Sequence, residues 1–339
     1  MGAGARALTA RSGAAAALWL TVALAAGAFA ALLVGPYPLA IGEALPILSG
    51  GGGDGQAETV LLSIRLPRVA ASLLVGAALA AAGACYQTLF RNPLVSPDIL
   101  GVSAGAGLGA VLGIFLSLPV LAIQALGFAG GLAAVALVGF VAAAVRSGDR
   151  TLILVLAGVV VGALAGAATS LLKVLADPYD QLPAITFWLL GSLAGVKTED
   201  ILPAAPVVLA GLVPMVALRW RINVLALGDE EARALGVEAG RLRLAVIVCA
   251  TLITASVVAV AGVVGWVGLV IPHIARMIVG PGFGQLLPAA ALLGAGYMLA
   301  VDTLARTISA VEVPLGILTA VVGAPFFLWL LARGRRTWA

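Results

Sequence analysis

Long runs of apolar residues alternate with short polar stretches along almost the whole sequence. Each run approaches the roughly 20 residues that a helix needs to cross a bilayer. Charged residues, prolines and glycines mark the breaks, which divide the chain into about ten predicted membrane helices, the eighth of them short and interrupted by Pro272. The predicted spans are residues 15–35, 62–90, 97–116, 120–145, 151–174, 201–218, 244–262, 264–279, 286–307 and 314–332.

The composition indicates that lipid is the solvent for most of this chain. Of its 339 residues, 62% are hydrophobic and 10% are charged, whereas a soluble domain carries about 25% charged residues. No charged or Ser/Pro-rich linker divides the sequence, so residues 1–339 are predicted to form one all-α membrane domain. The first apolar run follows Arg6 and Arg11, as in a signal peptide. It is longer than the roughly 7–15 residues of a signal-peptide core, and we therefore interpret it as a membrane helix.

Small residues recur at helical spacing in two of the predicted helices. Membrane helices pack closely through small residues, because lipid provides no hydrophobic force between helices. Both stripes therefore predict helix–helix contacts rather than chemistry. The first stripe is Gly101, Gly105, Gly109 and Gly113, and the second is Gly158, Gly162 and Gly166.

Basic residues are distributed unevenly between the two sides of the predicted helices. With the N-terminus inside, 14 of the 19 lysines and arginines fall on the inner side. Basic residues gather on the cytoplasmic side of helical membrane proteins, so we expect a multi-pass inner-membrane protein with both termini in the cytoplasm. The inner residues are Arg6, Arg11, Arg91, Arg146, Arg150, Arg219, Arg221, Arg233, Arg241, Arg243, Arg276, Arg333, Arg335 and Arg336; the outer ones are Arg65, Arg68, Lys173, Lys197 and Arg306.

Three connections between the predicted helices differ from the others. Residues 36–59 are predicted to form an outer Gly/Pro-rich loop without a periodic pattern. Residues 176–200 contain Phe187, Trp188 and Leu190, which predict an outer interfacial helix. Residues 225–243 are the most charged stretch and are expected on the inner face.

The inner stretch 225–243 has the signals of a short helix. Gly228 and Asp229 are predicted to cap its start, acidic residues follow, and Gly236 is predicted to end it in the left-handed conformation. A solvated loop is the alternative. Leu227, Ala232 and Leu235 would give the helix an apolar face, however, and such a face favours a groove on a partner protein.

Several blocks of the sequence together form a family pattern, in order and spacing. They are RLPR (65–68), VGAALAAAG (75–83), Gln87, RNPLVSPDILGVSAGAG (91–107), LGDEEARALGV (227–237), VGLVIPHIAR (267–276), DTLAR (302–306) and GAPFFLWLL (323–331). From about residue 15 to the C-terminus the chain resembles the FecCD family of ABC importer permeases, which includes cobalamin, haem and ferric-siderophore permeases. The resemblance implies ten helices per subunit, a second permease subunit in a homodimer, two cytoplasmic ABC ATPases and a periplasmic substrate-binding protein.

The resemblance also assigns roles to residues. The ATPase-coupling residues that it implies are Leu227, Gly228, Asp229, Glu230, Glu231, Ala232, Leu235 and Gly236. The implied cytoplasmic gate comprises Asn92 and Leu94, with Ser147 and Asp149 in a turn whose residues differ from the Ser/Thr version of the cobalamin permease. Arg65, Arg68 and Arg306 match outer arginines that bind acidic residues of the binding protein.

Other interpretations of the conspicuous charged residues remain open. Arg65 and Arg68 lie one helical turn apart and could instead anchor the helix at the membrane interface. Arg306 could pair with Asp302, four residues earlier, in a structural ion pair. His273, the only histidine, follows Pro272 and is predicted to bond a carbonyl freed by the helix break, although a metal-ligand or proton-relay role is the alternative.

The sequence lacks the motifs for bound cofactors. The nearest match to a phosphate-binding loop, Gly191 to Thr198, has Val196 between the glycine and Lys197, so ATP and Mg²⁺ are expected on a separate ATPase chain. Cys85 and Cys249 have no close Cys or His spacing, and no metal site, catalytic site or bound cofactor is predicted. The arginines form no patch interleaved with aromatic residues, so nucleic acid is not an expected partner.

Two other functions compete with an importer permease. Gly101 to Gly105 fits the G-x-S-x-G pattern of a serine hydrolase, with Ser103 as nucleophile and His273 as base. A secondary transporter is the second alternative, but such proteins carry ionisable groups at mid-membrane, whereas the charges here are expected near helix ends. For an importer, the favoured cargo is an iron–siderophore or haem, and cobalamin or an oxyanion remains open.

Overall fold

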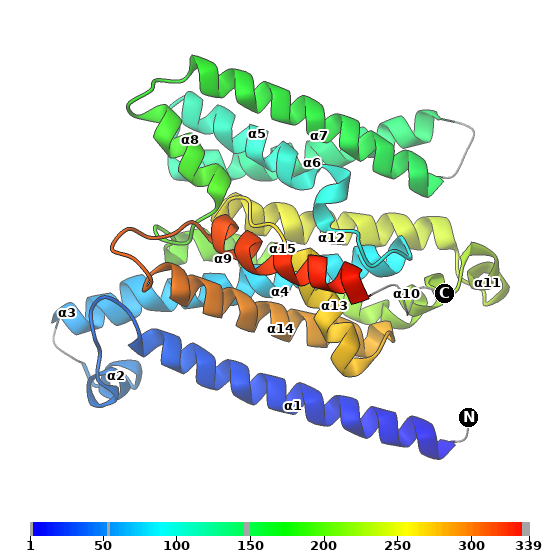
Figure 1. Cartoon of the computed structure of the whole chain (residues 1–339), viewed down its shortest axis with the longest axis horizontal. Coiled ribbons are helices and arrows are strands. Elements are labelled where there is room, and N and C mark those ends of the chain that lie inside the picture. The colour runs from blue at the N-terminus through cyan, green and yellow to red at the C-terminus, as the bar shows by residue number, and fades with distance from the viewer. Residues whose placement is uncertain (1–2, 53–54, 146–149, 334–339) are drawn as a thin grey trace.

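The computed structural model describes residues 3–52, 55–145 and 150–333, and over these ranges it is helical without β-strands. Figure 1 shows the long helices lying side by side along one axis. In chain order the elements are α1 (Ala3–Leu33), α2 (Ile41–Leu48), α3 (Gly55–Glu58), the π-helix η1 (Thr59–Arg65), α4 (Leu66–Leu89), the 3₁₀ helix η2 (Pro97–Leu100), α5 (Val102–Phe115), α6 (Val120–Ala144), α7 (Arg150–Leu175), α8 (Gln181–Leu190), α9 (Thr198–Ala217), α10 (Arg219–Leu225), α11 (Asp229–Ala234), α12 (Ala239–Ala261), α13 (Val267–Val279), α14 (Phe283–Ala305) and α15 (Leu315–Arg333).

The predicted membrane helices are present, which confirms the all-α membrane fold. Six described helices are long and apolar enough to cross a bilayer: Gly55–Leu89, α6, α7, α9, α12 and α14. The other four predicted spans correspond to shorter apolar helices, namely Ala17–Leu33 of α1, α5, α13 and α15. One boundary was wrong: the span predicted at 97–116 is a 3₁₀ turn followed by a helix of only 14 residues.

The two ends of the bundle differ in the elements that they carry. The beginning of α1, the end of α15, α10 and α11 lie at one end, whereas α2, α3 and α8 lie at the other (Figure 1). This arrangement separates the segments predicted to be inner from those predicted to be outer. We refer to the end with α10 and α11 as the inner end, and to the end with α2 and α3 as the outer end.

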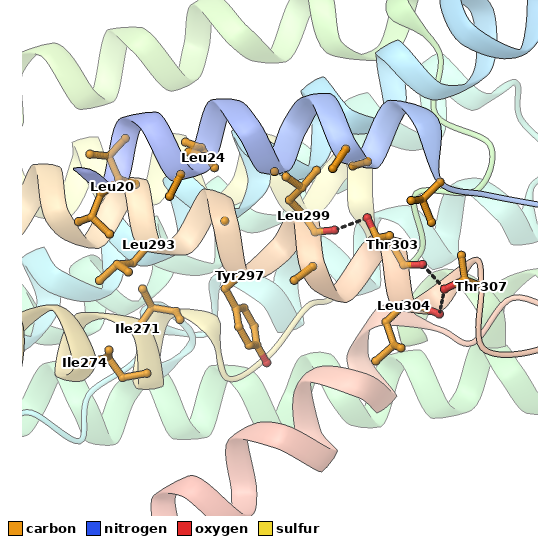
Figure 2. Close-up of a pocket in the computed structure, with 18 residues that line it drawn as sticks. Leu20, Leu24, Ile271, Ile274, Leu293, Tyr297, Leu299, Thr303, Leu304 and Thr307 are labelled. Carbon is orange, nitrogen blue, oxygen red and sulfur yellow. Dashed lines mark hydrogen bonds between the residues drawn. The ribbon is translucent and has the colours of Figure 1, made fainter. Parts of the chain in front are cut away.

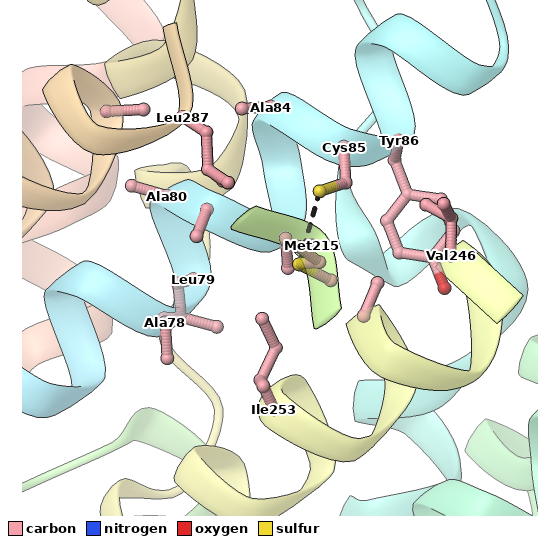
Figure 3. Packing of buried hydrophobic residues seen from close by; sticks show 14 of the residues in the cluster. Ala78, Leu79, Ala80, Ala84, Cys85, Tyr86, Met215, Val246, Ile253 and Leu287 are labelled. Atoms are coloured by element: carbon pink, nitrogen blue, oxygen red, sulfur yellow. Dashed lines mark hydrogen bonds between the residues drawn. The ribbon is translucent and has the colours of Figure 1, made fainter. Parts of the chain in front are cut away.

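Helix α4 lies at the centre of the bundle. Of the 18 residues that define the membrane span in the stretch Gly55–Leu89, 78% are buried, against 22% of the corresponding 18 residues in each of α6, α7 and α9. Helix α4 packs against α9, α12, α13 and α14. Figure 3 shows this packing, with the sulfur of Cys85 on α4 3.3 Å from that of Met215 on α9 and Ile253 of α12 nearby. The described core is made mainly of alanine, valine and leucine side chains.

At most positions of the two glycine stripes, the predicted helix–helix contacts are present. A Cβ atom added at Gly105 would lie 2.4 Å from the carbonyl oxygen of Gly130 on α6, and one at Gly109 would lie 2.0 Å from that of Leu126. In the second stripe, Gly158 approaches the carbonyl of Ile99 in the same way, whereas a Cβ at Gly166 would meet open space. Gly166 is therefore not a contact within the described part of this subunit.

Helices α4 and α13 approach each other closely at a pair of glycines. A Cβ atom at Gly83 would lie 1.9 Å from the carbonyl oxygen of Gly268. Gly83→Ala should therefore force the two helices apart and lower the free energy of unfolding by about 1–3 kcal/mol. Thermal unfolding in detergent measures this change. Gly166→Ala is the matched control and should be neutral or slightly stabilising, because its Cβ would be unopposed and alanine favours helix. Equal unfolding temperatures for the two variants would contradict the packing argument.

The described part of the outer connection 36–59 contains more helix than its composition predicts. It includes α2 and α3, and α2 buries Ala44 and Ile47 in a small cluster with Ala31 and Leu61. The Glu43 carboxylate accepts a hydrogen bond from the Ala40 backbone N–H at 3.2 Å, which caps the start of α2. Its apolar residues Ile41, Ala44, Leu45 and Leu48 do follow helical spacing, but eight residues that include Pro46 are too few for the pattern to stand out from a loop. In the stretch 176–200, α8 forms with Ile185 buried, as an outer helix was predicted.

Candidate functional site

The inner segment 225–243 forms the predicted short helix, α11. Its start is held by an ion pair in which Arg243 of α12 lies 2.8 Å from the Asp229 carboxylate. Gly228 and Gly236, with φ of 134° and 76°, flank the helix in backbone conformations that favour glycine. Gly228 occupies the N-cap position and has no side chain to cap the helix, while the Asp229 carboxylate in the first turn accepts a hydrogen bond from Arg243.

The apolar residues of this segment do not share one face. The Leu227 and Leu235 side chains are 60% and 54% exposed, whereas Ala232 is fully buried. Ala232 therefore packs against its own chain, and its prediction as part of an exposed apolar face was wrong. Leu227 and Leu235 remain as the exposed apolar pair, beside the exposed carboxylates of Glu230 and Glu231.

The connection after α4 is a turn at the inner end. The Asn92 side-chain Oδ1 accepts a hydrogen bond from the Leu94 backbone N–H at 2.9 Å, and both residues are exposed. The preceding Arg91 has a φ of 49°. A Cβ atom added at Gly228 would lie 3.5 Å from Arg91 Nη1, so this turn lies beside the start of α11. Ser147 and Asp149, the other predicted gate residues, fall outside the described residues.

The three predicted docking arginines are buried, with exposed fractions of 3% for Arg65, 5% for Arg68 and 5% for Arg306. Arg65 donates hydrogen bonds to the carbonyl oxygens of Leu32 and Leu33 at 2.8 and 2.9 Å, and also to that of Tyr37. The first two carbonyls lie at the end of α1, where backbone acceptors lack helical donors. Arg65 therefore satisfies the end of α1.

Arg68 and Arg306 form a buried ion cluster with two acids. Arg68 Nε lies 2.8 Å from Asp302 Oδ1, and its Nη1 lies 2.6 Å from Glu312 Oε1. Arg306 Nε lies 3.9 Å from Asp302 Oδ2, and Arg306 also donates a hydrogen bond to the carbonyl of Ala31. Arg306 and Asp302 thus form a long ion pair, as the structural alternative expected, but their two facing atoms do not hydrogen-bond. The expectation that these side chains reach outward is corrected, because their guanidinium groups already bind internal acceptors.

Helix α13 continues through Pro272, so the predicted interruption there was wrong. The carbonyls that the proline leaves without a donor are satisfied by a residue to which the sequence analysis gave no role. Pro272 has no N–H to donate to the Gly268 carbonyl. Gln87 of α4 instead donates to the carbonyls of Leu269 at 3.1 Å and Gly268 at 3.5 Å, and its own Oε1 accepts a hydrogen bond from Arg276 at 3.1 Å. The proline itself was the available signal, because a freed carbonyl requires a donor from elsewhere.

His273 does not take the structural role predicted for it. Its Nδ1 atom is buried without a hydrogen-bond partner among the described residues. Its ring lies edge-on to Phe326 of α15, with 6.4 Å between ring centroids. The prediction that it bonds a freed carbonyl was therefore wrong, and Gln87 does so instead.

The serine motif lies in the wrong local structure for a nucleophile. Ser103 follows a 3₁₀ turn at the beginning of α5, whereas a nucleophile elbow follows a strand. The Ser103 hydroxyl donates a hydrogen bond to Asp98 Oδ1. Asp98 is exposed. It lies in the 3₁₀ helix η2 rather than near the end of a long helix, where charged residues were expected.

An apolar groove of about 750 Å³ runs between α1, α13 and α14. Figure 2 shows it lined by Leu24, Ile271 and Leu293. The hydroxyls of Thr303 and Thr307 donate their protons to backbone carbonyls, so they offer a ligand no hydrogen-bond donor. The groove therefore has the character of a lipid-facing surface rather than a polar binding site.

Comparison with known proteins identifies relatives over nearly the whole chain. The model of the FecCD transport family matches residues 23–333. The cobalamin import system permease protein of Halobacterium salinarum is 41% identical over 92% of this chain and 88% of its own length. The molybdate import system permease protein of Haemophilus influenzae is 39% identical over 94% of this chain and 95% of its own. A solved ABC transporter assigned to the metal-chelate type, in an inward-facing conformation, matches with a TM-score of 0.85 and 38% identity, covering 94% of this chain and 98% of that one.

Proposed function

Because this chain belongs to the FecCD transport family, we propose that it is the membrane-spanning subunit of an ATP-driven importer for a metal chelate. The observation that carries the proposal is the near-complete overlap, at 38% identity, with a transporter assigned to the metal-chelate type. The chain is thus a permease rather than an enzyme, and it spans the membrane with several apolar helices.

The proposed assembly contains a second copy of this chain, two ABC ATPases and a substrate-binding protein. The exposed pair Leu227 and Leu235 supports an ATPase contact at the inner end, because two large apolar side chains would otherwise face the cytosol. In this assembly ATP and Mg²⁺ bind to the ATPase chains. Asn92 and Leu94, beside the start of α11, would form part of the cytoplasmic gate.

The binding protein would dock at the outer end. There the buried Arg65, Arg68 and Arg306 would fix the ends of α1, α4 and α14 rather than contact the partner themselves. In the proposed assembly the chain lies in the inner membrane with both termini in the cytoplasm, an orientation that the distribution of basic residues supports.

The proposed cargo is a metal chelate, with an iron–siderophore or haem favoured. Relatives named for cobalamin and for molybdate have nearly equal identity to this chain, 41% and 39%. Overall identity therefore does not choose between a large chelate and an oxyanion.

Uptake by proteoliposomes tests the function. The chain would be reconstituted with its cognate ATPase and binding protein, and supplied with radiolabelled ferric hydroxamate, haem, cobalamin or molybdate. We expect accumulation of one cargo that requires both ATP and the binding protein. Accumulation driven by an ion gradient without ATP would contradict the proposal and favour a secondary transporter.

A further inference from the structure

The segment between α4 and α5 re-enters the membrane region from the inner end. Helix α5 has 14 residues, which gives a length of about 21 Å, less than the roughly 30 Å of hydrocarbon in a bilayer. The chain therefore covers the remaining depth as the turn at 91–96 and the 3₁₀ helix η2.

Two close contacts fix the depth of this segment. A Cβ atom at Gly131 of α6 would lie 3.2 Å from the Val102 carbonyl oxygen, and Gly131 lies 13 residues, about 20 Å, before α6 ends at Ala144. A Cβ at Gly158 of α7 would lie 2.1 Å from the Ile99 carbonyl oxygen, and Gly158 lies 8 residues, about 12 Å, beyond Arg150. Residues 97–102 thus lie inside the span of the flanking helices.

Asp98 lies in this segment as an exposed residue, with its carboxylate partly covered where it accepts the hydrogen bond from Ser103. The Ser103 hydroxyl donates a hydrogen bond to Oδ1, and among the residues whose side chains the structure describes no lysine, arginine or histidine forms an ion pair with the carboxylate. An exposed, unpaired carboxylate at membrane depth is too costly against lipid, so its exposed face must meet water or another protein group. Non-helical backbone at this depth must likewise face water or protein rather than lipid.

We propose that Asp98 lines the hydrated route of the cargo and selects it by charge. The carboxylate, oriented by Ser103, lies on the segment that leads to the turn of Asn92 and Leu94. It would favour a cargo that presents positive charge or hydrogen-bond donors, and it would repel an anionic one. This proposal rests on the proposed transport function but concerns a residue that neither the family resemblance nor the gate prediction assigned.

Charged thiol reagents measure the potential at this position directly. In full-length protein in nanodiscs, with Cys85→Ala and Cys249→Ala, Ile99→Cys provides a reporter beside Asp98. The measured quantity is the ratio of two reaction rates, that with a cationic trimethylammonium thiosulfonate divided by that with an anionic sulfonate thiosulfonate. Asp98→Asn should lower that ratio on the order of tenfold, as expected for removing a nearby charge at intermediate dielectric. Asp98→Glu should largely preserve it, and so should the control Glu199→Gln at the exposed beginning of α9.

Two outcomes would overturn the proposal. If the reporter fails to react with either reagent in the folded protein, and Asp98→Cys in the same background also fails, the segment does not meet water. If it reacts but Asp98→Asn leaves the ratio unchanged, the carboxylate does not set the local potential. The labelling requires neither ATP nor partner subunits, so its failure leaves the uptake experiment unaffected, and a failure of uptake leaves the labelling result standing.

Discussion

Replacing Asp302 by alanine should lower the free energy of unfolding by about 3–5 kcal/mol, because it leaves two buried guanidinium groups without their shared acid. The Asp302 side chain is fully buried between Arg68 and Arg306, whose side chains are 6% and 4% exposed. Buried ion pairs contribute little net stability, but removing one partner uncovers the desolvation cost of the other. Because Asp302 lies between two arginines, the loss of its carboxylate should reduce the yield of folded protein.

Glu312 supplies the matched control, since it also binds Arg68 but is 39% exposed. Glu312→Gln keeps the shape and an acceptor oxygen, and water can compensate the lost charge, so we expect a change below about 1 kcal/mol. Folded yield and unfolding temperature, measured by size-exclusion chromatography and fluorescence in detergent, separate the two variants. Similar behaviour of Asp302→Ala and Glu312→Gln would contradict the view that Asp302 balances the cluster.

The same cluster illustrates what the sequence could not reveal about the outer arginines. Their spacing and their place at helix ends fit either a docking surface or an internal tie, and only the positions of Leu32, Tyr37 and Glu312 decide between them. Tyr37 and Glu312 lie in connections without a regular pattern, where periodicity carries no positional information. The Asp302–Arg306 pair was predictable because its two residues are four positions apart at the end of one helix.

Local signals predicted the helices well and the polar contacts between them poorly. The membrane spans follow from apolar length, and the α5–α6 contact follows from the glycine stripe at Gly105 and Gly109. Gln87 and Asp98, by contrast, act through residues that are distant in sequence or through their depth in the membrane. Gln87 bonds a carbonyl 181 residues away, and the exposure of Asp98 depends on α5 being too short to span, a boundary that the hydropathy pattern obscured.

Introducing aspartate at both Leu227 and Leu235 should abolish association with the ATPase and thereby all ATP-driven uptake. The two side chains are the exposed large apolar residues of the coupling segment. If they enter a desolvated groove on the ATPase, each buried charge should cost about 2 kcal/mol or more of binding free energy. Co-purification of the ATPase with tagged permease measures the association, and uptake by proteoliposomes measures the consequence.

Two variants of the same segment distinguish a lost contact from a misfolded one. Arg241→Ala removes an exposed ion pair with Glu238, at 2.9 Å, and should leave ATPase association nearly intact, because exposed pairs contribute at most about 1 kcal/mol. Ala232→Arg should instead lower the yield of folded permease, because Ala232 is fully buried against its own chain. The double aspartate variant should therefore fold normally and bind no ATPase. If it retains both the ATPase and transport, α11 and its flanking leucines do not carry the coupling, and the ATPase contact must lie elsewhere on the inner end.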